Sequence, residues 1–209
     1  VAVVGRALPL FPPGGVTFVR VADPRATLAG VARRFYKSPD RAMSVVGVTG
    51  AAGKTTVAHI LKHLLEDERR VGLLGTVRYD LGARVVPALR TTPESLEIFG
   101  LLAQMRDAGC REAIVEVSAQ GIEQRRVRGL QFEACVFTNL AADHPGGPAA
   151  LEELALMKAR LFTSEAEAPP PLSIVNLDDA HGRRLAAGLA AQIAATRVVT
   201  FGEHPQAQV

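Results

Sequence analysis

The 209-residue sequence has no tryptophan, two tyrosines and two cysteines. With so few aromatic side chains to stack on bases, we expect no nucleic-acid partner. Cys110 and Cys135 are too few for a disulfide framework, and both fall at or near expected strands. We interpret them as buried free thiols of a reducing compartment, in preference to a disulfide pair.

Long apolar runs are also missing. No segment approaches the roughly 20 apolar residues of a membrane span and no signal peptide is visible, so we expect no membrane partner and a cytoplasmic location. The net charge is only +3, and a content of 22% charged and 48% hydrophobic residues is typical of a globular protein. We expect one or two domains and a monomer. Because the sequence begins at Val1 and stops at Val209 without a terminating element, we also expect a fragment.

The most informative segment joins a strand expected at 44–49 to a helix expected at 54–66, through a glycine-rich turn that ends in Lys54 and Thr55. Glycines allow backbone N–H groups to surround phosphate oxygens, and the helix N-terminus adds a positive dipole. Lys54 adds a point charge, and the hydroxyl of Thr55 can ligate the Mg²⁺ that accompanies a nucleotide. The pattern therefore predicts that a nucleotide binds at Gly50, Ala51, Ala52, Gly53, Lys54, Thr55 and Thr56.

This loop departs from the strict pattern G-x-x-x-x-G-K-[ST] at one position, because Val48 stands where the pattern has glycine. The alternative is an ordinary glycine-rich turn before a helix. Since strand, turn, Lys-Thr-Thr and helix occur together, the pattern favours phosphate binding.

Strands and helices alternate along the rest of the chain. Strands are expected at 71–75, 112–117, 133–138, 172–176 and 197–201, and helices at 94–108, 149–164 and 179–193. The β-branched runs between helices predict an α/β fold of the P-loop nucleotide-binding type, with a mostly parallel sheet and helices on both faces. Ligands bind at the carboxyl ends of such strands, which makes residues 116–118, 138–139 and 176–179 site candidates. Asp178 and Asp179 favour a helix cap over a metal site.

The N-terminal part differs from this pattern. Two apolar runs within residues 1–22 look like the last strands of an upstream domain, and residues 23–41 contain a linker helix. Asp23 is expected to cap this helix over 24–37, whose buried apolar face is predicted to comprise Leu28, Val31, Ala32 and Phe35. Thr91 and Thr92 are expected to cap the helix over 94–108.

The predicted strand ends carry a series of short motifs. Residues 47–56 hold the phosphate loop, 116–121 read Glu-Val-Ser-Ala-Gln-Gly, 137–144 contain Phe-Thr-Asn-Leu followed by Asp-His, 156–162 read Leu-Met-Lys-Ala-Arg-Leu-Phe, and 176–179 read Asn-Leu-Asp-Asp. In this order the motifs resemble those of the Mur ligase family, which joins amino acids to UDP-MurNAc peptides in cell-wall synthesis. The resemblance implies that residues 42–209 are that family's central ATP-binding domain, incomplete here, and that its C-terminal ligase domain is absent.

The resemblance implies ATP and Mg²⁺ as cofactors, and a carboxylate that takes the γ-phosphate of ATP before an amine attacks it. Lys54 would hold the β- and γ-phosphates, and Thr55 with Glu116 would hold one Mg²⁺. His144 would lie near the γ-phosphate and the metal, with an ordinary loop histidine as the alternative. Lys158 would be carbamylated and ligate a second Mg²⁺. Taken alone, this residue is more typical of a solvated helix lysine, but the Leu-Phe pair at 161–162 reverses that preference.

Other positions match substrate contacts of the family. Asn139 and Asn176 would lie on the nucleotide side, or simply cap the strand ends. The UDP-MurNAc peptide would contact Thr91, Thr92, Ser118, Gln124 and Arg126. Residues 91–93 and the spacing of Gln124 and Arg126 favour the MurE branch, which adds the third residue of the peptide. Arg126 can grip a carboxylate or phosphate at two points, or belong with Arg125 and Arg128 to a solvated basic turn.

The chain departs from the family pattern at several positions. Ala51 and Ala52 replace Thr-Asn in the loop, which weakens side-chain bracing but keeps the backbone grip. Ala119 replaces a serine that contacts substrate, and Gln120 replaces a metal-ligating histidine; a neutral amide is a poorer Mg²⁺ ligand than a carboxylate. Residues 143–148 lack the second half of the family's Asp-His-Leu-Asp-x-His-Gly. The changes cluster around the second metal and the acceptor pocket.

Two functional hypotheses follow. The first is an ATP-dependent amide ligase of the MurE type, which joins an amino acid to UDP-MurNAc-L-Ala-D-Glu. The second is a nucleotide-binding but catalytically weak relative. A ligase similar to folylpolyglutamate synthase shares the fold, but residues 91–93 and the spacing of Gln124 and Arg126 disfavour it. Because the amine-binding domain is missing, we expect the 209-residue chain alone to be inactive.

Overall fold

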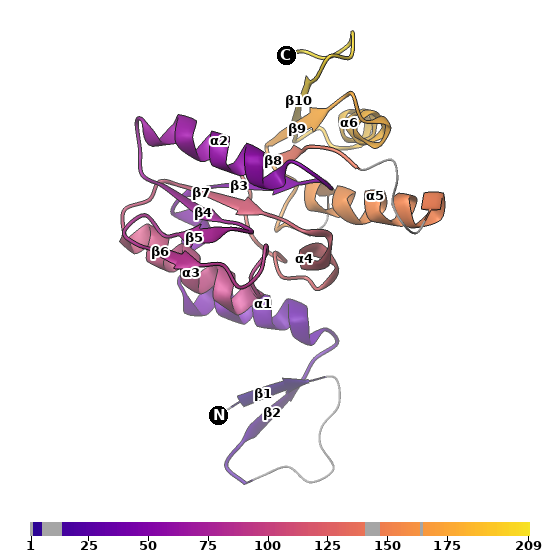
Figure 1. Ribbon diagram of the computed structural model, residues 1–209. Helices are drawn as coiled ribbons and strands as arrows, with labels where there is room; N and C mark the ends of the chain where they lie inside the picture. The colour runs from indigo at the N-terminus through magenta and orange to yellow at the C-terminus, as the bar shows by residue number, and fades with distance from the viewer. Residues whose placement is uncertain (1, 6–13, 141–146, 164) are drawn as a thin grey trace.

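In the computed structural model of the protein, residues 2–5, 14–140, 147–163 and 165–209 are described. Their largest element is an eight-stranded sheet in the order β10-β9-β8-β3-β7-β4-β5-β6 (Figure 1). The strands are β3 (Ser44–Thr49), β4 (Val71–Leu74), β5 (Arg78–Asp80), β6 (Val85–Pro87), β7 (Glu112–Glu116), β8 (Ala134–Phe137), β9 (Leu172–Asn176) and β10 (Arg197–Phe201). The helices are α1 (Pro24–Phe35), α2 (Lys54–Glu66), α3 (Ser95–Asp107), α4 (Ala119–Glu123), α5 (Gly147–Thr163) and α6 (Ala180–Gln192), with a 3₁₀ turn at Pro39–Arg41.

The sheet is mostly parallel, as the sequence predicts. Every neighbouring pair from β10 to β4 is parallel, whereas β5 and β6 are antiparallel. In the register of the central strands, Val48 of β3 lies beside Glu116 of β7 and Val136 of β8. The carboxyl ends of these three strands therefore meet at one edge of the sheet, where the phosphate-loop motif begins.

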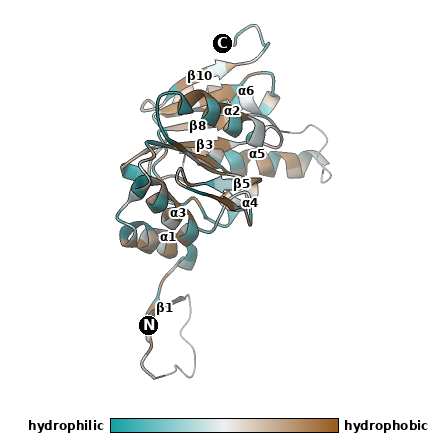
Figure 2. Ribbon diagram, turned by 60° about the vertical axis from the view of Figure 1, so that its left-hand side comes forward, coloured by the Kyte–Doolittle hydropathy of each residue, from teal (hydrophilic) through white to brown (hydrophobic). Residues whose placement is uncertain are grey.

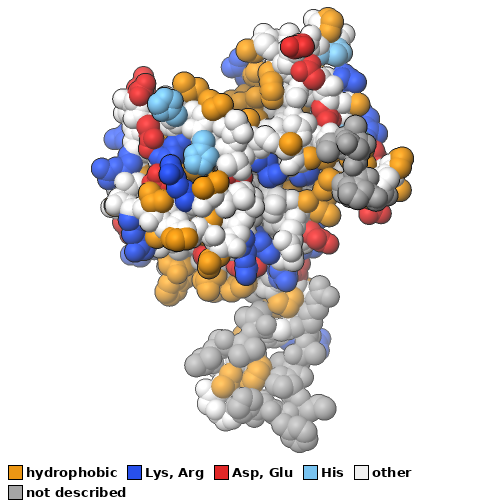
Figure 3. Space-filling view, in the orientation of Figure 1, with side chains coloured by type: hydrophobic (Ala, Val, Ile, Leu, Met, Phe, Trp, Pro, Cys, Tyr) orange, Lys and Arg blue, Asp and Glu red, His pale blue; other side chains and the backbone are white. Residues whose placement is uncertain are grey.

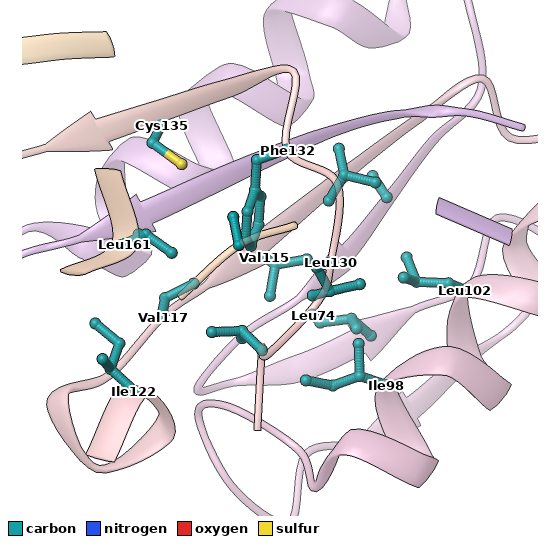
Figure 4. Packing of buried hydrophobic residues seen from close by; sticks show 14 of the residues in the cluster. Leu74, Ile98, Leu102, Val115, Val117, Ile122, Leu130, Phe132, Cys135 and Leu161 are labelled. Atoms are coloured by element: carbon teal, nitrogen blue, oxygen red, sulfur yellow. The ribbon is translucent and has the colours of Figure 1, made fainter. Parts of the chain in front are cut away.

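Helices cover both faces of this sheet. On one face α2 packs on Val48, Val71 and Ile114 through a small apolar cluster. On the other face a larger cluster joins the sheet to α3, α5 and α6, and α1 packs on α3 (Figures 1 and 2). Figure 4 shows part of the larger cluster, in which Leu74 points toward Ile98 of α3. The layers explain why the inner strands read as continuous apolar runs.

Three elements were not expected from the sequence. Strands β5 and β6 form an antiparallel extension of the sheet within a stretch that reads as polar loop. Each has only three residues, too few for alternation of apolar and polar side chains to be recognised. Helix α4 has five residues and lies between the strands expected at 112–117 and 133–138, where no helix is predicted. Residues that flank these elements, Thr76, Thr91 and Ser118, lie near Glu116 at the carboxyl edge of the sheet.

Helix α1 confirms its predicted cap but not its predicted face. The carboxylate of Asp23 accepts hydrogen bonds from the backbone N–H groups of Arg25 and Ala26. The buried side chains are Ala29 and Ala32, whereas Leu28, Val31 and Phe35 are 42%, 56% and 74% exposed. The small alanines allow α1 to approach α3 closely, so the stripe of larger apolar residues faces outward. Figure 3 shows hydrophobic side chains along this lower edge of the main body.

The N-terminal strands β1 (Ala2–Gly5) and β2 (Thr17–Arg20) form a separate parallel pair (Figure 1). The assignment of residues 1–22 to an upstream domain stays a prediction. Cys110 and Cys135 are both buried and free, as expected, and burial raises the pKa of both thiols. In the described part of the chain, no helix is long and apolar enough to span a bilayer.

Candidate functional site

The phosphate loop has the conformation that its glycines predict. Gly50 and Gly53 adopt φ angles of 149° and 78°, which side chains with a Cβ rarely adopt. A Cβ on Gly50 would lie 1.9 Å from Oγ1 of Thr138. Thr138 closes on the loop from β8, and its hydroxyl donates to the carbonyl of Ala52 at 2.7 Å. Glycine at 50 therefore lets the end of β8 pack directly against the loop.

Asn139 is hydrogen-bonded to the same loop. Its backbone carbonyl accepts from the N–H of Ala51 at 2.7 Å, and its side-chain oxygen accepts from the N–H of Ala52 at 3.0 Å. Its amide also donates to the carbonyl of Ala52 at 3.3 Å. Asn139 thus fixes the two residues at which this chain lacks the family's Thr-Asn side chains. A contact to nucleotide stays a prediction for Asn139.

The first turn of α2 leaves its amides free for an anion. Gly53 occupies the N-cap position, and among the described residues no side chain caps the helix there. The first N–H groups of an α-helix have no partner within the helix, so those of Lys54, Thr55 and Thr56 point out of the N-terminus. With the helix dipole, they form the kind of site that binds phosphate.

Two lysines converge on one carbonyl group of this loop. The ammonium groups of Lys54 and Lys158 donate to the carbonyl oxygen of Gly50 at 3.0 and 2.9 Å. Lys158 is only 2% exposed, so the interpretation as a solvated helix lysine is wrong. Burial, reinforced by the charge of Lys54, lowers the pKa of Lys158 to about 8. Burial also lowers the pKa of Lys54, an effect that the negative charge of Glu116 opposes.

A buried carboxylate faces the start of α2. Glu116 at the end of β7 is 0% exposed, and its Oε2 accepts a hydrogen bond from the hydroxyl of Thr55 at 2.9 Å. Hard oxygen ligands of this kind suit Mg²⁺, which also keeps water and phosphate oxygens in its shell. Among the described residues there is no cluster of three or more histidine, cysteine, aspartate or glutamate side chains suited to a metal ion. The fit to Mg²⁺ therefore rests on Thr55, Glu116 and the oxygens of a nucleotide.

The same carboxylate meets a residue that the sequence analysis missed. Thr76 donates from its backbone N–H to Oε1 of Glu116 at 3.1 Å and from its hydroxyl to Oε2 at 2.9 Å. A Cβ on Gly75 would lie 2.2 Å from Oε1 of Glu116, so glycine permits this approach. The position of Thr76 could have identified it. Gly75 and Thr76 directly follow strand β4, at the same edge of the sheet as the loop.

The threonine pair expected on the acceptor side reaches the same centre. Oγ1 of Thr91 lies 3.1 Å from Oγ1 of Thr76. The hydroxyl of Thr92 donates to the backbone carbonyl of Glu116 at 2.9 Å and accepts from the N–H of Ser118 at 2.9 Å. Neither threonine caps α3: its N-cap residue is Glu94, which makes no side-chain capping bond. The expected cap is wrong because the hydroxyl of Thr92 is hydrogen-bonded to Glu116 and Ser118 at the end of β7.

Arg126 and Gln124 are joined to this threonine segment. Arg126 is 6% exposed and donates to the backbone carbonyl of Thr92 at 2.8 Å and to the side-chain oxygen of Gln124 at 2.6 Å. It also forms an ion pair with Glu94 at 3.1 Å. The alternative of a solvated basic turn is therefore wrong for Arg126, which is buried and bonded to Thr92 and Gln124, whereas a contact to the UDP-MurNAc peptide stays a prediction.

The remaining predicted residues are less closely tied to this centre. Asn176 donates to the backbone carbonyl of Thr138 at 2.8 Å and accepts from the N–H of Asp178 at 2.9 Å, as a strand-end cap does. Its contact to nucleotide stays a prediction. Asp179 caps α6, as expected. Gln120 is exposed on α4, the helix that Ser118 caps through the N–H of Gly121. His144 lies outside the described residues.

Comparison with known proteins places this arrangement in a family. The Mur ligase middle domain family matches residues 48–209. The chain belongs to the Mur ligase family. This agrees with the α/β architecture and with the family resemblance of the strand-end motifs.

Several relatives of this Mur ligase chain are similar to it over most of its length. A UDP-N-acetylmuramoyl-L-alanyl-D-glutamate–2,6-diaminopimelate ligase of Caldanaerobacter subterraneus subsp. tengcongensis is 40% identical over 166 residues, which cover 79% of this chain and 34% of the relative. The ligase of the same name from Geobacter metallireducens is 36% identical over 202 residues, which cover 94% of this chain and 39% of the relative.

A solved structure gives the same result. The structure of a UDP-N-acetylmuramoyl-L-alanyl-D-glutamate–2,6-diaminopimelate ligase superposes with a TM-score of 0.76 at 27% identity, over 95% of this chain and 39% of that protein. These similar proteins are ligases of the MurE type. The chain spans only a third to two fifths of their length, 34% and 39% for the two relatives above.

Proposed function

We propose that the whole protein is an ATP-dependent ligase of the MurE type, which joins an amino acid to UDP-MurNAc-L-Ala-D-Glu through an acyl-phosphate in peptidoglycan synthesis. The main support for this proposal is that three features lie together at one edge of the sheet. They are the uncapped start of α2, the Thr55–Glu116 pair, and the threonines at 91 and 92. Phosphoryl transfer requires mainly positioning and charge neutralisation, and these groups supply both.

The donor half of the site consists of the loop and its lysine. The amides of Lys54, Thr55 and Thr56 would hold phosphate oxygens, and the Lys54 ammonium would move from the loop carbonyls to the β- and γ-phosphates. Thr55 and Glu116 would hold Mg²⁺, which neutralises charge on the phosphates. Because Glu116 is fully buried, its carboxylate keeps one orientation, as a preorganised ligand requires.

Lys158 fits the carbamylated lysine that we expect. Its pKa of about 8 leaves part of the amine neutral near pH 7.5. A neutral amine can attack dissolved CO₂: its lone pair forms the N–C bond, one C–O π bond of CO₂ breaks and leaves its electron pair on oxygen, and an N–H proton leaves to solvent. The resulting carbamate is an anion beside Lys54, so repulsion between two cations becomes attraction. The product would present oxygen ligands for a second Mg²⁺.

The acceptor half extends from Thr91 to Ser118. We propose that Thr91, Thr92, Ser118, Gln124 and Arg126 together form the surface that binds the UDP-MurNAc peptide. Thr91 and Ser118 are half-buried and lie next to the Glu116 segment, where they can contact a ligand. Thr92 and Arg126 are buried, and we assign them the support of this surface through the 2.8 Å bond between them.

The alternative is a relative that binds nucleotide but is catalytically weak, and the exposed Gln120 is the feature that favours it. Phosphate release by the whole protein, given ATP, Mg²⁺, UDP-MurNAc-L-Ala-D-Glu and 2,6-diaminopimelate, distinguishes the two. The proposal expects release that depends on the amino acid. Nucleotide binding without such release supports the alternative, and in that case Gln120→His is expected to raise turnover.

A further inference from the structure

Thr76 has an unusual relation to the buried carboxylate of the site. It is exposed and lies just after β4, yet it contacts both carboxylate oxygens of Glu116, through its backbone N–H at 3.1 Å and its hydroxyl at 2.9 Å. Thr55 contacts only Oε2. Because two contacts from one residue restrain rotation of the carboxylate about its last bond, Thr76 sets the direction of the Glu116 lone pairs more firmly than Thr55 does.

The hydroxyl of Thr76 also links the two halves of the site. A hydroxyl has one proton, and the carboxylate is a stronger acceptor than another hydroxyl. Thr76 therefore gives its proton to Glu116 and accepts from Thr91, whose Oγ1 lies 3.1 Å away. If Thr55 used its hydroxyl oxygen to ligate a cation, Thr76 would still hold the carboxylate in place through its two hydrogen bonds.

We propose that Thr76 is a positioning residue, whose hydroxyl holds the Glu116 carboxylate in the orientation that binds Mg²⁺ together with Thr55. This inference rests on the proposed function, because it requires that Mg²⁺ and nucleotide bind here. Its effect is separable from folding: the side chain is exposed, so a substitution at 76 leaves the apolar clusters intact.

The test is calorimetric titration of the chain with a non-hydrolysable ATP analogue, with EDTA and at a series of Mg²⁺ concentrations. Thr76→Val keeps the shape but removes the hydroxyl, and Thr76→Ser keeps the hydroxyl. Thr163→Val is the matched control, an exposed threonine of α5 that bonds only to the carbonyl of Ala159 among the described residues. Thr76→Val is expected to weaken apparent Mg²⁺ affinity about tenfold, the effect of one hydrogen bond to a charged group.

The affinity for the ATP analogue in EDTA is expected to be unchanged in all variants. Thr76→Ser is expected to have the same Mg²⁺ affinity as the original chain. Equal Mg²⁺ affinity in Thr76→Val, or an equal loss in Thr76→Ser, overturns the role of the hydroxyl while nucleotide binding stands. If the unsubstituted chain shows no Mg²⁺-dependent binding, the proposed function itself fails and the inference falls with it.

Discussion

The burial of Lys158 beside Lys54 leads to a prediction about stability and pH. Lys158 is 2% exposed, and its pKa is about 8 in the folded protein against an ordinary value of 10.5. The folded state therefore holds this proton less tightly than the unfolded state. Below pH 8 the charged, buried amine costs about 3 kcal/mol of folding free energy. Between pH 8 and 10.5 the unfolded chain binds more protons, so this cost disappears as the pH rises.

The perturbation is Lys158→Met, which keeps the length of the side chain and removes the charge. Urea unfolding of both proteins at pH 7, 8, 9 and 10, in CO₂-free buffer, gives the free energy of unfolding of each. The difference between the original chain and the variant is expected to shift by about 2.5 kcal/mol in favour of the original chain from pH 7 to pH 10. The comparison is needed because the buried thiols, whose pKa is raised, lower stability at high pH in both proteins.

A difference that stays constant from pH 7 to pH 10 would refute the reasoning. It would mean that the folded and unfolded states bind the Lys158 proton equally well, and that the amine is better solvated than its 2% exposure implies. The support for carbamylation from a neutral amine would then be lost.

The remaining predictions concern backbone and packing, and each is checked by urea unfolding. Gly50→Ala is expected to cost about 2 kcal/mol or more, because φ is 149° and the new Cβ would lie 1.9 Å from Thr138; Gly30→Ala, in the open middle of α1, is the matched control and should stabilise by about 0.5–1 kcal/mol. Equal effects at the two glycines would contradict the loop geometry. Val31→Ser is expected to change stability by less than about 0.5 kcal/mol, whereas Ala32→Leu should cost about 1–3 kcal/mol; the reverse order would show that α1 buries its other face.

The phosphate loop could be predicted because its information is local. Strand β3, the glycines and Lys54 are contiguous, and the conformation of Gly50 and Gly53 follows from the lack of a Cβ. The parallel sheet could also be predicted, since buried strands on both faces read as apolar runs. From that topology alone, Glu116 and Asn139 were expected at the same edge as the loop, and they lie there.

Tertiary context decided what the sequence did not reveal. Helix α1 offers two apolar stripes, and its pattern alone cannot show that close packing on α3 selects the small Ala29 and Ala32. Nothing local distinguishes Thr76 from a loop threonine, because its role depends on Glu116, which is 40 positions away in sequence. The burial of Lys158 beneath the loop arises in the same way.

The central claim is that the loop before α2 binds a nucleotide with Mg²⁺. Calorimetric titration of the chain with ATP tests it most directly, with and without Mg²⁺, for the original sequence and for Lys54→Ala. His63→Ala, at the far exposed end of α2, is the control. Mg²⁺-dependent binding is expected to be lost in Lys54→Ala and kept in His63→Ala, with all three proteins folded by circular dichroism. Unchanged ATP affinity in folded Lys54→Ala would contradict it.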